Sequence, residues 1–155
     1  MKFNFKPVLS VLVLAVLLGY AGCGKDKNPA PSTEEVQLGK LNGTWAVGAG
    51  GNVTLDNVSK TGDYSGFTLT LNGTAGSTSY NYSTAGRPSL SPWPASGTWT
   101  FGSDAEKSVI RDPGTDQVII NYTATDTQLE LTFDYADGGE AAKVNGQWVF
   151  TLTKQ

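Results

Sequence analysis

The chain has 155 residues, with 11 basic and 14 acidic side chains, one cysteine and no histidine. Its acidic balance excludes the basic surface that nucleic-acid binding requires. One cysteine cannot form an intramolecular disulfide, and a chain without imidazole has no histidine to act as general base or metal ligand.

Residues 1–22 have the layout of a secretory signal. Lys2 and Lys6 precede an apolar run at 8–18, and small residues follow it before Cys23. Because a helix needs about 20 residues to cross a bilayer core, this run is too short to span one. We therefore expect a signal peptide that is helical in the precursor and removed from the mature protein, and not a transmembrane anchor.

The signal ends in Tyr20, Ala21, Gly22 and Cys23. This segment resembles the lipobox of bacterial lipoproteins, in which the cysteine is linked to diacylglycerol and becomes the first residue after cleavage. The resemblance implies lipidation of Cys23, and a diacylated or triacylated cysteine anchors a protein durably to a membrane. Gly24 follows where an aspartate would resemble an inner-membrane retention signal, so we expect the outer membrane, with the domain periplasmic or surface-exposed. The alternative is an ordinary signal that is cleaved nearby and leaves an incidental free thiol.

Residues 24–40 are polar, contain Pro29 and Pro31, and have no apolar periodicity. This composition predicts a flexible tether. We therefore divide the chain into a signal peptide at 1–22, a lipidated cysteine with its tether at 23–40, and one domain at 41–155. The length of the mature chain suits a single hydrophobic core.

The domain is predicted to be all-β, because apolar and polar residues alternate in short runs from Leu41 onward. The clearest runs lie at 67–71, 99–101, 118–122, 129–135 and 148–152, with weaker ones at 44–48, 51–56, 78–84 and 107–111. Turn formers such as Asp112-Pro113-Gly114 and Asn145-Gly146 separate them. About 8–9 strands at this spacing indicate an antiparallel up-and-down barrel, with a β-sandwich as the alternative.

A glycine stands two places before a tryptophan three times, in Gly43-Thr44-Trp45, Gly97-Thr98-Trp99 and Gly146-Gln147-Trp148. The glycine allows a tight turn, and we expect the indoles to plug one end of the domain or to line its core. The first segment resembles the glycine-x-tryptophan motif of lipocalins, and residues 41–154 are most similar to the small lipocalin-like lipoproteins of Bacteroidetes. The resemblance implies a lipocalin-like barrel in which Gly43 and Trp45 have a structural role at the closed end. Arg111 and Lys154 can each be proposed as the counterpart of the arginine that covers this tryptophan in lipocalins.

A barrel of about eight strands can enclose one small ligand, and lipocalin relatives commonly carry apolar ones. Our leading functional expectation is therefore a non-catalytic binding domain for a small apolar ligand. The side chains expected to contact that ligand are Tyr80, Tyr82, Trp93, Phe101 and Phe133. The alternative is a structural lipoprotein whose core is filled by its own side chains.

A module that binds glycans or a cell surface is a second alternative. Tyr80, Tyr82 and Trp93 lie within a stretch at 77–96 that is rich in serine, glycine and proline, and exposed aromatic faces stack on sugars. The prolines of this stretch exclude a central strand around Trp93. In the competing interpretation, Trp93 folds over one end of the domain as a lid on the core.

Acidic residues come in small groups, which are Asp104 with Glu106, Asp112 with Asp116, and Asp134 with Asp137. Paired carboxylates can hydrolyse glycosidic bonds or hold calcium, but no spacing here matches a defined loop motif. Turns attract aspartate for local hydrogen bonds, which accounts for these positions. We therefore expect no enzymatic activity, no cofactor and no metal, and a monomer whose partners are the membrane and its ligand.

Overall fold

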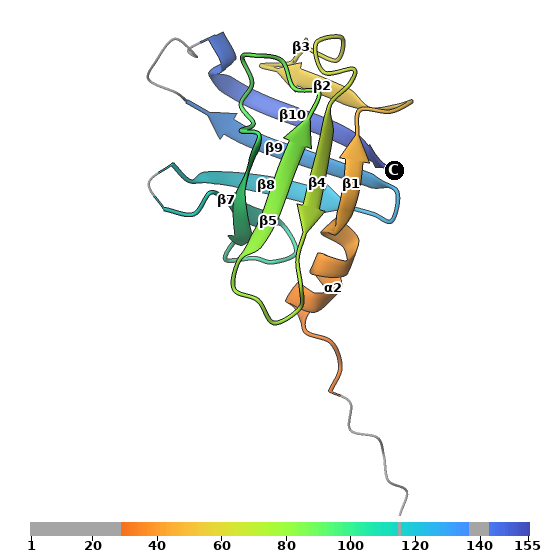
Figure 1. The fold of residues 1–155 in the computed structure, drawn as a ribbon, viewed down its shortest axis with the longest axis vertical. Helices are drawn as coiled ribbons and strands as arrows, with labels where there is room; N and C mark the ends of the chain where they lie inside the picture. Colours follow the sequence, from red (N-terminus) through yellow and green to blue (C-terminus); the bar gives the residue numbers. More distant parts are fainter. Residues whose placement is uncertain (1–28, 115, 137–142) are drawn as a thin grey trace, which may run out of the picture. The chain divides into compact units, whose positions relative to one another are not determined.

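Residues 29–114, 116–136 and 143–155 are described by the computed structural model (Figure 1). The predicted signal peptide, Cys23 and residues 24–28 of the predicted tether lie outside them. Within these residues, no helix has the length and apolar character that crossing a membrane requires. Residues Pro31–Gln155 form one compact part of the chain, which contains every strand of the described residues.

The strands of this part follow the alternation of apolar and polar residues. Their bounds are β1 Gly43–Ala46, β2 Asn52–Leu55, β3 Val58–Ser59, β4 Thr68–Asn72, β5 Tyr80–Ala85, β6 Ser96–Phe101, β7 Ser108–Arg111, β8 Val118–Ala124, β9 Gln128–Tyr135 and β10 Gly146–Lys154. Each predicted run coincides with one of these strands. The short strand β3 is the exception that the sequence does not predict. It follows a tight hairpin turn in which Asp56 and Asn57 both have positive φ, at 50° and 64°.

The sheet closes on itself because β1 pairs with both β4 and β10. The strands from β4 to β10 pair in sequence order, so that with β1 they form a closed antiparallel barrel (Figure 1). The predicted barrel is therefore confirmed, and the sandwich alternative is wrong. One edge of β10 pairs with β2 at residues 148–151 and with β1 at 153–154. Strands β1 and β2 thus act as two halves of one interrupted strand, and the β2–β3 hairpin extends the sheet beyond the barrel.

The barrel interior is packed with the apolar residues of the alternating runs. Trp45, Trp99 and Trp148 are among its largest fully buried side chains. On β8 the inward Ile120 is buried, while its neighbour Ile119 is 58% exposed, as a period of two requires. The core is therefore aromatic and comes from both halves of the chain.

Helix α2, Thr33–Leu41, occupies the second half of the predicted tether. Its first turn is capped reciprocally, because the Ser32 hydroxyl accepts from the Glu35 amide and the Glu35 carboxylate accepts from the Ser32 amide. Leu38 and Leu41 belong to the hydrophobic core, so the folded domain begins before residue 41. The prediction of a flexible segment is therefore wrong for 33–40. Two apolar anchors three positions apart are too few to produce the periodicity by which an amphipathic helix is recognised.

Tyr122 joins helix α2 to the barrel. Its hydroxyl donates to the carbonyl oxygen of Ala105 and lies 3.4 Å from Oε1 of Gln37, a buried residue of the helix. Burial, with smaller effects from the Asp104 and Glu106 carboxylates, raises the pKa of Tyr122 to about 12. The folded state therefore favours the neutral hydroxyl.

We predict that alkaline conditions weaken the fold partly through Tyr122. Because an unfolded tyrosine has a pKa of about 10, the stability present below that pH is lost as the pH rises from about 10 to about 12. Tyr122→Phe removes the hydroxyl hydrogen bond, so its free energy of unfolding at neutral pH should be about 1 kcal/mol lower than that of the parent. As the pH rises, this free energy should fall less steeply in the variant than in the parent. Burial also raises the pKa values of Tyr64, Tyr80 and Tyr82, so some decline remains in the variant. Urea unfolding at about pH 8 and about pH 11 measures both effects, and equal declines in the two proteins would contradict the prediction.

Candidate functional site

Trp45 closes the end of the barrel next to helix α2. Its indole is fully buried, and Nε1 donates to the carbonyl oxygen of Leu41 at 2.8 Å. The Lys154 ammonium lies 5.1 Å from the centre of the Trp45 ring, which is within the range of a cation–π contact. Of the two cations left open by the lipocalin resemblance, Lys154 covers this tryptophan, and Arg111 lies over Trp93 instead.

The repeated glycine-x-tryptophan segments at the two ends of the domain share a backbone geometry. Gly43 and Gly146 have φ values of 133° and 134°, which glycine adopts far more readily than other residues. The Trp148 indole donates at 2.7 Å to the carbonyl oxygen of Val144. The Trp45 indole donates in the same way to Leu41, and each acceptor lies four residues before its tryptophan. The same turn thus directs both tryptophans inward at the start of their strands.

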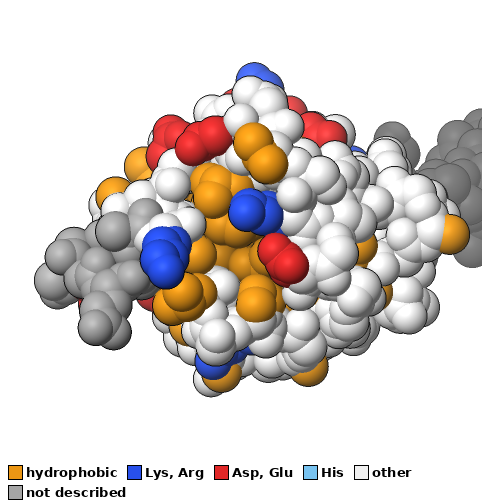
Figure 2. All heavy atoms as spheres, turned by 90° about the horizontal axis from the view of Figure 1, so that it is seen from above, with side chains coloured by type: hydrophobic (Ala, Val, Ile, Leu, Met, Phe, Trp, Pro, Cys, Tyr) orange, Lys and Arg blue, Asp and Glu red, His pale blue; other side chains and the backbone are white. Residues whose placement is uncertain are grey.

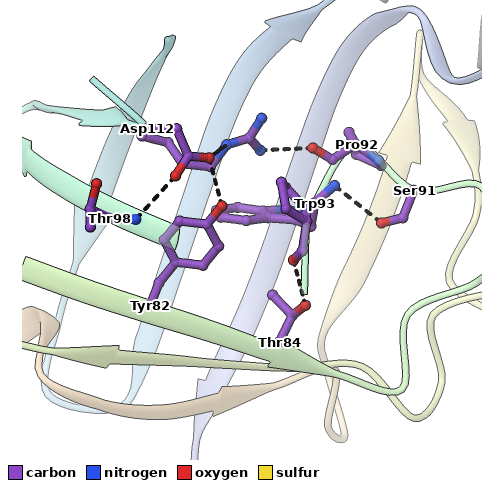
Figure 3. Close-up of polar contacts among 9 residues, drawn as sticks. Tyr82, Thr84, Ser91, Pro92, Trp93, Thr98 and Asp112 are labelled. Carbon is purple, nitrogen blue, oxygen red and sulfur yellow. Dashed lines mark hydrogen bonds and ion pairs between the residues drawn. The ribbon is translucent and has the colours of Figure 1, made fainter. Parts of the chain in front are cut away.

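Trp93 belongs to the loop between β5 and β6, at the end of the barrel opposite helix α2. We call this end the open end, although the Trp93 side chain fills it, and Figure 3 shows Trp93 beside Tyr82. Its ring lies 5.7 Å from the rings of Tyr82 and Phe133 and 6.2 Å from that of Phe150. Trp93 is only 3% exposed, so it is a lid on the core. Tyr80 and Tyr82 are 4% and 2% exposed. The three aromatic side chains therefore do not form an exposed stacking platform for sugars.

An ion pair between a buried arginine and a partly buried aspartate lies beside Trp93. Arg111 Nη1 donates to the carbonyl oxygen of Pro92 at 2.8 Å, and Arg111 Nε lies 3.4 Å from Oδ2 of Asp112. The Asp112 carboxylate also accepts from the Tyr82 hydroxyl at 2.7 Å and from the Thr98 amide at 3.0 Å (Figure 3). The network thus links β5, β6 and β7 to the loop that carries Trp93.

Arg111 was predicted only as a possible cover for Trp45, and the sequence did not indicate its place beside Trp93. It lies inward on β7 in step with Val109, and it is 3% exposed. Burial lowers the pKa of Arg111, and the neighbouring Tyr82 and Asp112 partly offset that effect. The available signal was a charged residue at an inward strand position, but arginine is seldom buried unless it is paired. Gly97 makes room for this pair, because a Cβ there would lie 2.0 Å from Oδ1 of Asp112.

The space left inside the barrel is small. A cavity of about 20 Å³ lies between Trp93, Arg111, Tyr82 and the surrounding apolar side chains, and a cavity of that size holds about one water molecule. Two buried groups of its lining residues, Trp93 Nε1 and Arg111 Nε, have no hydrogen-bond partner among the residues that the structure describes, although Arg111 Nε lies near the Asp112 carboxylate. The open end is therefore filled, but its polar groups are incompletely satisfied.

The predicted ligand contacts separate into two groups. Tyr82, Trp93 and Phe133 meet at the open end. Tyr80 and Phe101 instead pack around Trp99, with ring centres 4.6 Å and 5.3 Å from its ring. Only the first group adjoins the loop lid, so only it belongs to the candidate site.

Two of the predicted acidic residues, Asp104 and Asp112, serve local structure. Asp104 accepts from the Glu106 amide at 3.0 Å and pairs with Lys107 at 3.1 Å, as expected for a turn aspartate. Asp112 holds the network around Arg111, and Asp137 lies outside the described residues. Within the described ranges, no three His, Cys, Asp or Glu side chains gather into a metal-binding group.

The open end of the barrel thus combines a loop-borne indole, a buried cation and an apolar interior. Comparison of the chain with protein-family models, curated proteins and solved structures gave no match.

Proposed function

We propose that this chain is a bacterial lipoprotein, anchored in the outer membrane through an acylated Cys23, whose barrel binds a small apolar ligand without catalysis. The anchoring rests on the signal-like residues 1–22 and on the lipobox resemblance at 20–23. In cell fractionation, the wild-type chain is expected with the membranes and Cys23→Ser in the soluble fraction. Membrane association of the variant after a salt wash would overturn the anchor.

The binding proposal rests on one observation. A loop side chain, and not a strand residue, fills the open end of the barrel. Trp93 belongs to a loop with proline at 88, 92 and 94, and these residues have no amide hydrogen with which to join the sheet. The loop is tied to the barrel by few bonds, among them Thr84 Oγ1 to the Pro94 carbonyl at 2.8 Å and Arg111 to the Pro92 carbonyl at 2.8 Å. Withdrawal of Trp93 would open the interior and leave the strand pairing intact.

The energy of this withdrawal is moderate. Burial of an indole removes about 200 Å² from water and contributes about 5 kcal/mol. The unpaired Trp93 Nε1 offsets about 1–3 kcal/mol of that, because the group regains water when it is exposed. The two Arg111 contacts, to the Pro92 carbonyl and over the indole, add about 1.4 kcal/mol, so that opening costs about 4 kcal/mol and the open population is about 0.1%. A ligand that buries a similar apolar area in place of the indole would shift the population to the open form.

Native mass spectrometry of the Cys23→Ser chain, produced in its own host and never exposed to detergent, tests the binding. We expect an adduct of one small apolar molecule, displaced by an excess of the neutral probe N-phenyl-naphthylamine. The competing function, a structural lipoprotein with a filled core, is favoured by the small volume of the cavity. Repeated preparations that carry no adduct and bind no probe would establish that alternative and overturn the proposal.

A further inference from the structure

A groove of about 240 Å³ lies on the surface of the barrel's open end. Its floor is formed by the buried residues Tyr64, Val144 and Trp148, and its walls include Leu55 and the 44% exposed Leu90. Figure 2 shows this end of the molecule, where hydrophobic side chains gather in a hollow between charged ones. Unlike the interior, the groove is open with Trp93 in place.

The floor of the groove is continuous with the aromatic core. Tyr64 contacts Trp148 edge-on, with ring centres 5.6 Å apart, and it also lies 5.2 Å from Phe150. The Tyr64 hydroxyl lies 3.3 Å from Oγ of Ser91 on the Trp93 loop. These contacts hold the floor in a fixed position, so the groove is preformed.

The described residues that line the groove carry one more positive than negative charge, although the chain as a whole is acidic. Among the described residues, Lys60 and Lys143 line it against one acidic residue, Asp63. An apolar floor under an excess of positive charge is complementary to a molecule with an apolar body and an anionic group.

We propose that this groove binds a small anionic amphiphile, with its ring or short chain on Tyr64, Val144 and Trp148 and its anionic group beside Lys60 and Lys143. The groove is smaller than the roughly 300–1,000 Å³ of typical ligand pockets, so part of the molecule remains outside. The charged group is the part that stays in water. This site does not depend on withdrawal of Trp93. The groove proposal can therefore be tested independently of ligand binding inside the barrel.

Two fluorescent probes with the same aromatic framework test the site, namely anilinonaphthalene sulfonate, which is anionic, and N-phenyl-naphthylamine, which is neutral. Titrations use the Cys23→Ser chain, the double variant Lys60→Gln/Lys143→Gln, and Lys107→Gln as a control. Lys107 pairs with Asp104 and lines no part of the groove, so its substitution removes a positive charge elsewhere.

The double variant is expected to bind the anionic probe about tenfold more weakly, at about threefold per lysine, and Lys107→Gln to bind it as the parent does. Salt at about 1 M should lower the parent's affinity for the anionic probe towards that of the double variant. Leu90→Glu should also lower this affinity, because it adds a negative charge to the wall of the groove. The affinity for the neutral probe should not change with the lysines. Equal affinity of the parent and the double variant for the anionic probe, or no binding of that probe by the folded parent, would overturn the groove site. Binding inside the barrel would then still be judged by the mass-spectrometric adduct.

Discussion

Trp93→Ala is expected to destabilise the domain by about 3–5 kcal/mol and, at the same time, to create a binding site for a neutral apolar probe. The loss follows from removal of the indole contacts with Tyr82, Phe133 and Phe150. The gain follows because the vacated space joins the existing cavity of about 20 Å³. An engineered apolar cavity stays dry and accepts an apolar guest.

The measurement is urea unfolding with and without N-phenyl-naphthylamine, followed by probe fluorescence. The probe should recover part of the lost stability of Trp93→Ala, since a ligand that binds only the folded state stabilises it. Leu90→Ala is the matched control from the same loop, because Leu90 is 44% exposed and its loss should change stability by no more than about 0.5 kcal/mol. A Trp93→Ala protein that loses stability but binds no probe would mean that the loop collapses into the space, and the lid would then not guard a usable lumen.

The strands could be predicted because each has one buried face. The alternation of Leu129, Leu131 and Phe133 with polar residues follows directly from a half-buried strand, and β9 runs over Gln128–Tyr135. Helix α2 could not be found by the same means, since Leu38 and Leu41 are its only apolar core residues. The capping pair Ser32 and Glu35 was the better signal, because it depends on spacing and not on hydrophobicity.

The candidate site was only partly predictable for a different reason. The proline-rich surroundings of Trp93 indicate a loop, and the size of its apolar ring favours an inward position. The partners of Arg111 cannot be read in this way, because Pro92 lies 19 positions away in the chain and meets it only once the barrel closes. An arginine at an inward position breaks the burial pattern, and such a break is itself a reason to examine the residue.

Loss of the Asp112 charge is expected to destabilise the barrel more than loss of the Arg111 charge. Asp112→Asn retains a side chain that tolerates the positive φ of 48° at this position, but it leaves the buried guanidinium without its counter-ion. Breaking a fully buried pair costs about 3–5 kcal/mol. The Asp112 side chain is 27% exposed, so we expect a smaller loss of about 2 kcal/mol.

Arg111→Met replaces the cation with an apolar chain among Trp93, Phe133 and Tyr135, whose rings lie 5.0, 5.8 and 5.8 Å from the guanidinium. The Asp112 carboxylate that remains is partly exposed and keeps its hydrogen bonds from Tyr82 and Thr98, so the loss should be about 1.5 kcal/mol, below that of Asp112→Asn. Urea unfolding of both variants and of Arg111→Met/Asp112→Asn measures the coupling between the two residues. A loss in Arg111→Met that exceeds the loss in Asp112→Asn would show that the pair does not act through charge compensation.

The same substitution should also change the opening of the lid. Arg111→Met removes the hydrogen bond to the Pro92 carbonyl and the cation over the Trp93 ring, and both contacts are present only in the closed form. If together they favour closure by about 1.4 kcal/mol, the open population rises about tenfold and the apparent affinity for a neutral probe rises by the same factor. Asp112→Asn keeps both contacts, and its probe affinity should therefore remain near that of the parent. Equal probe affinities in the two variants would mean that Arg111 stabilises the barrel but does not hold the lid closed.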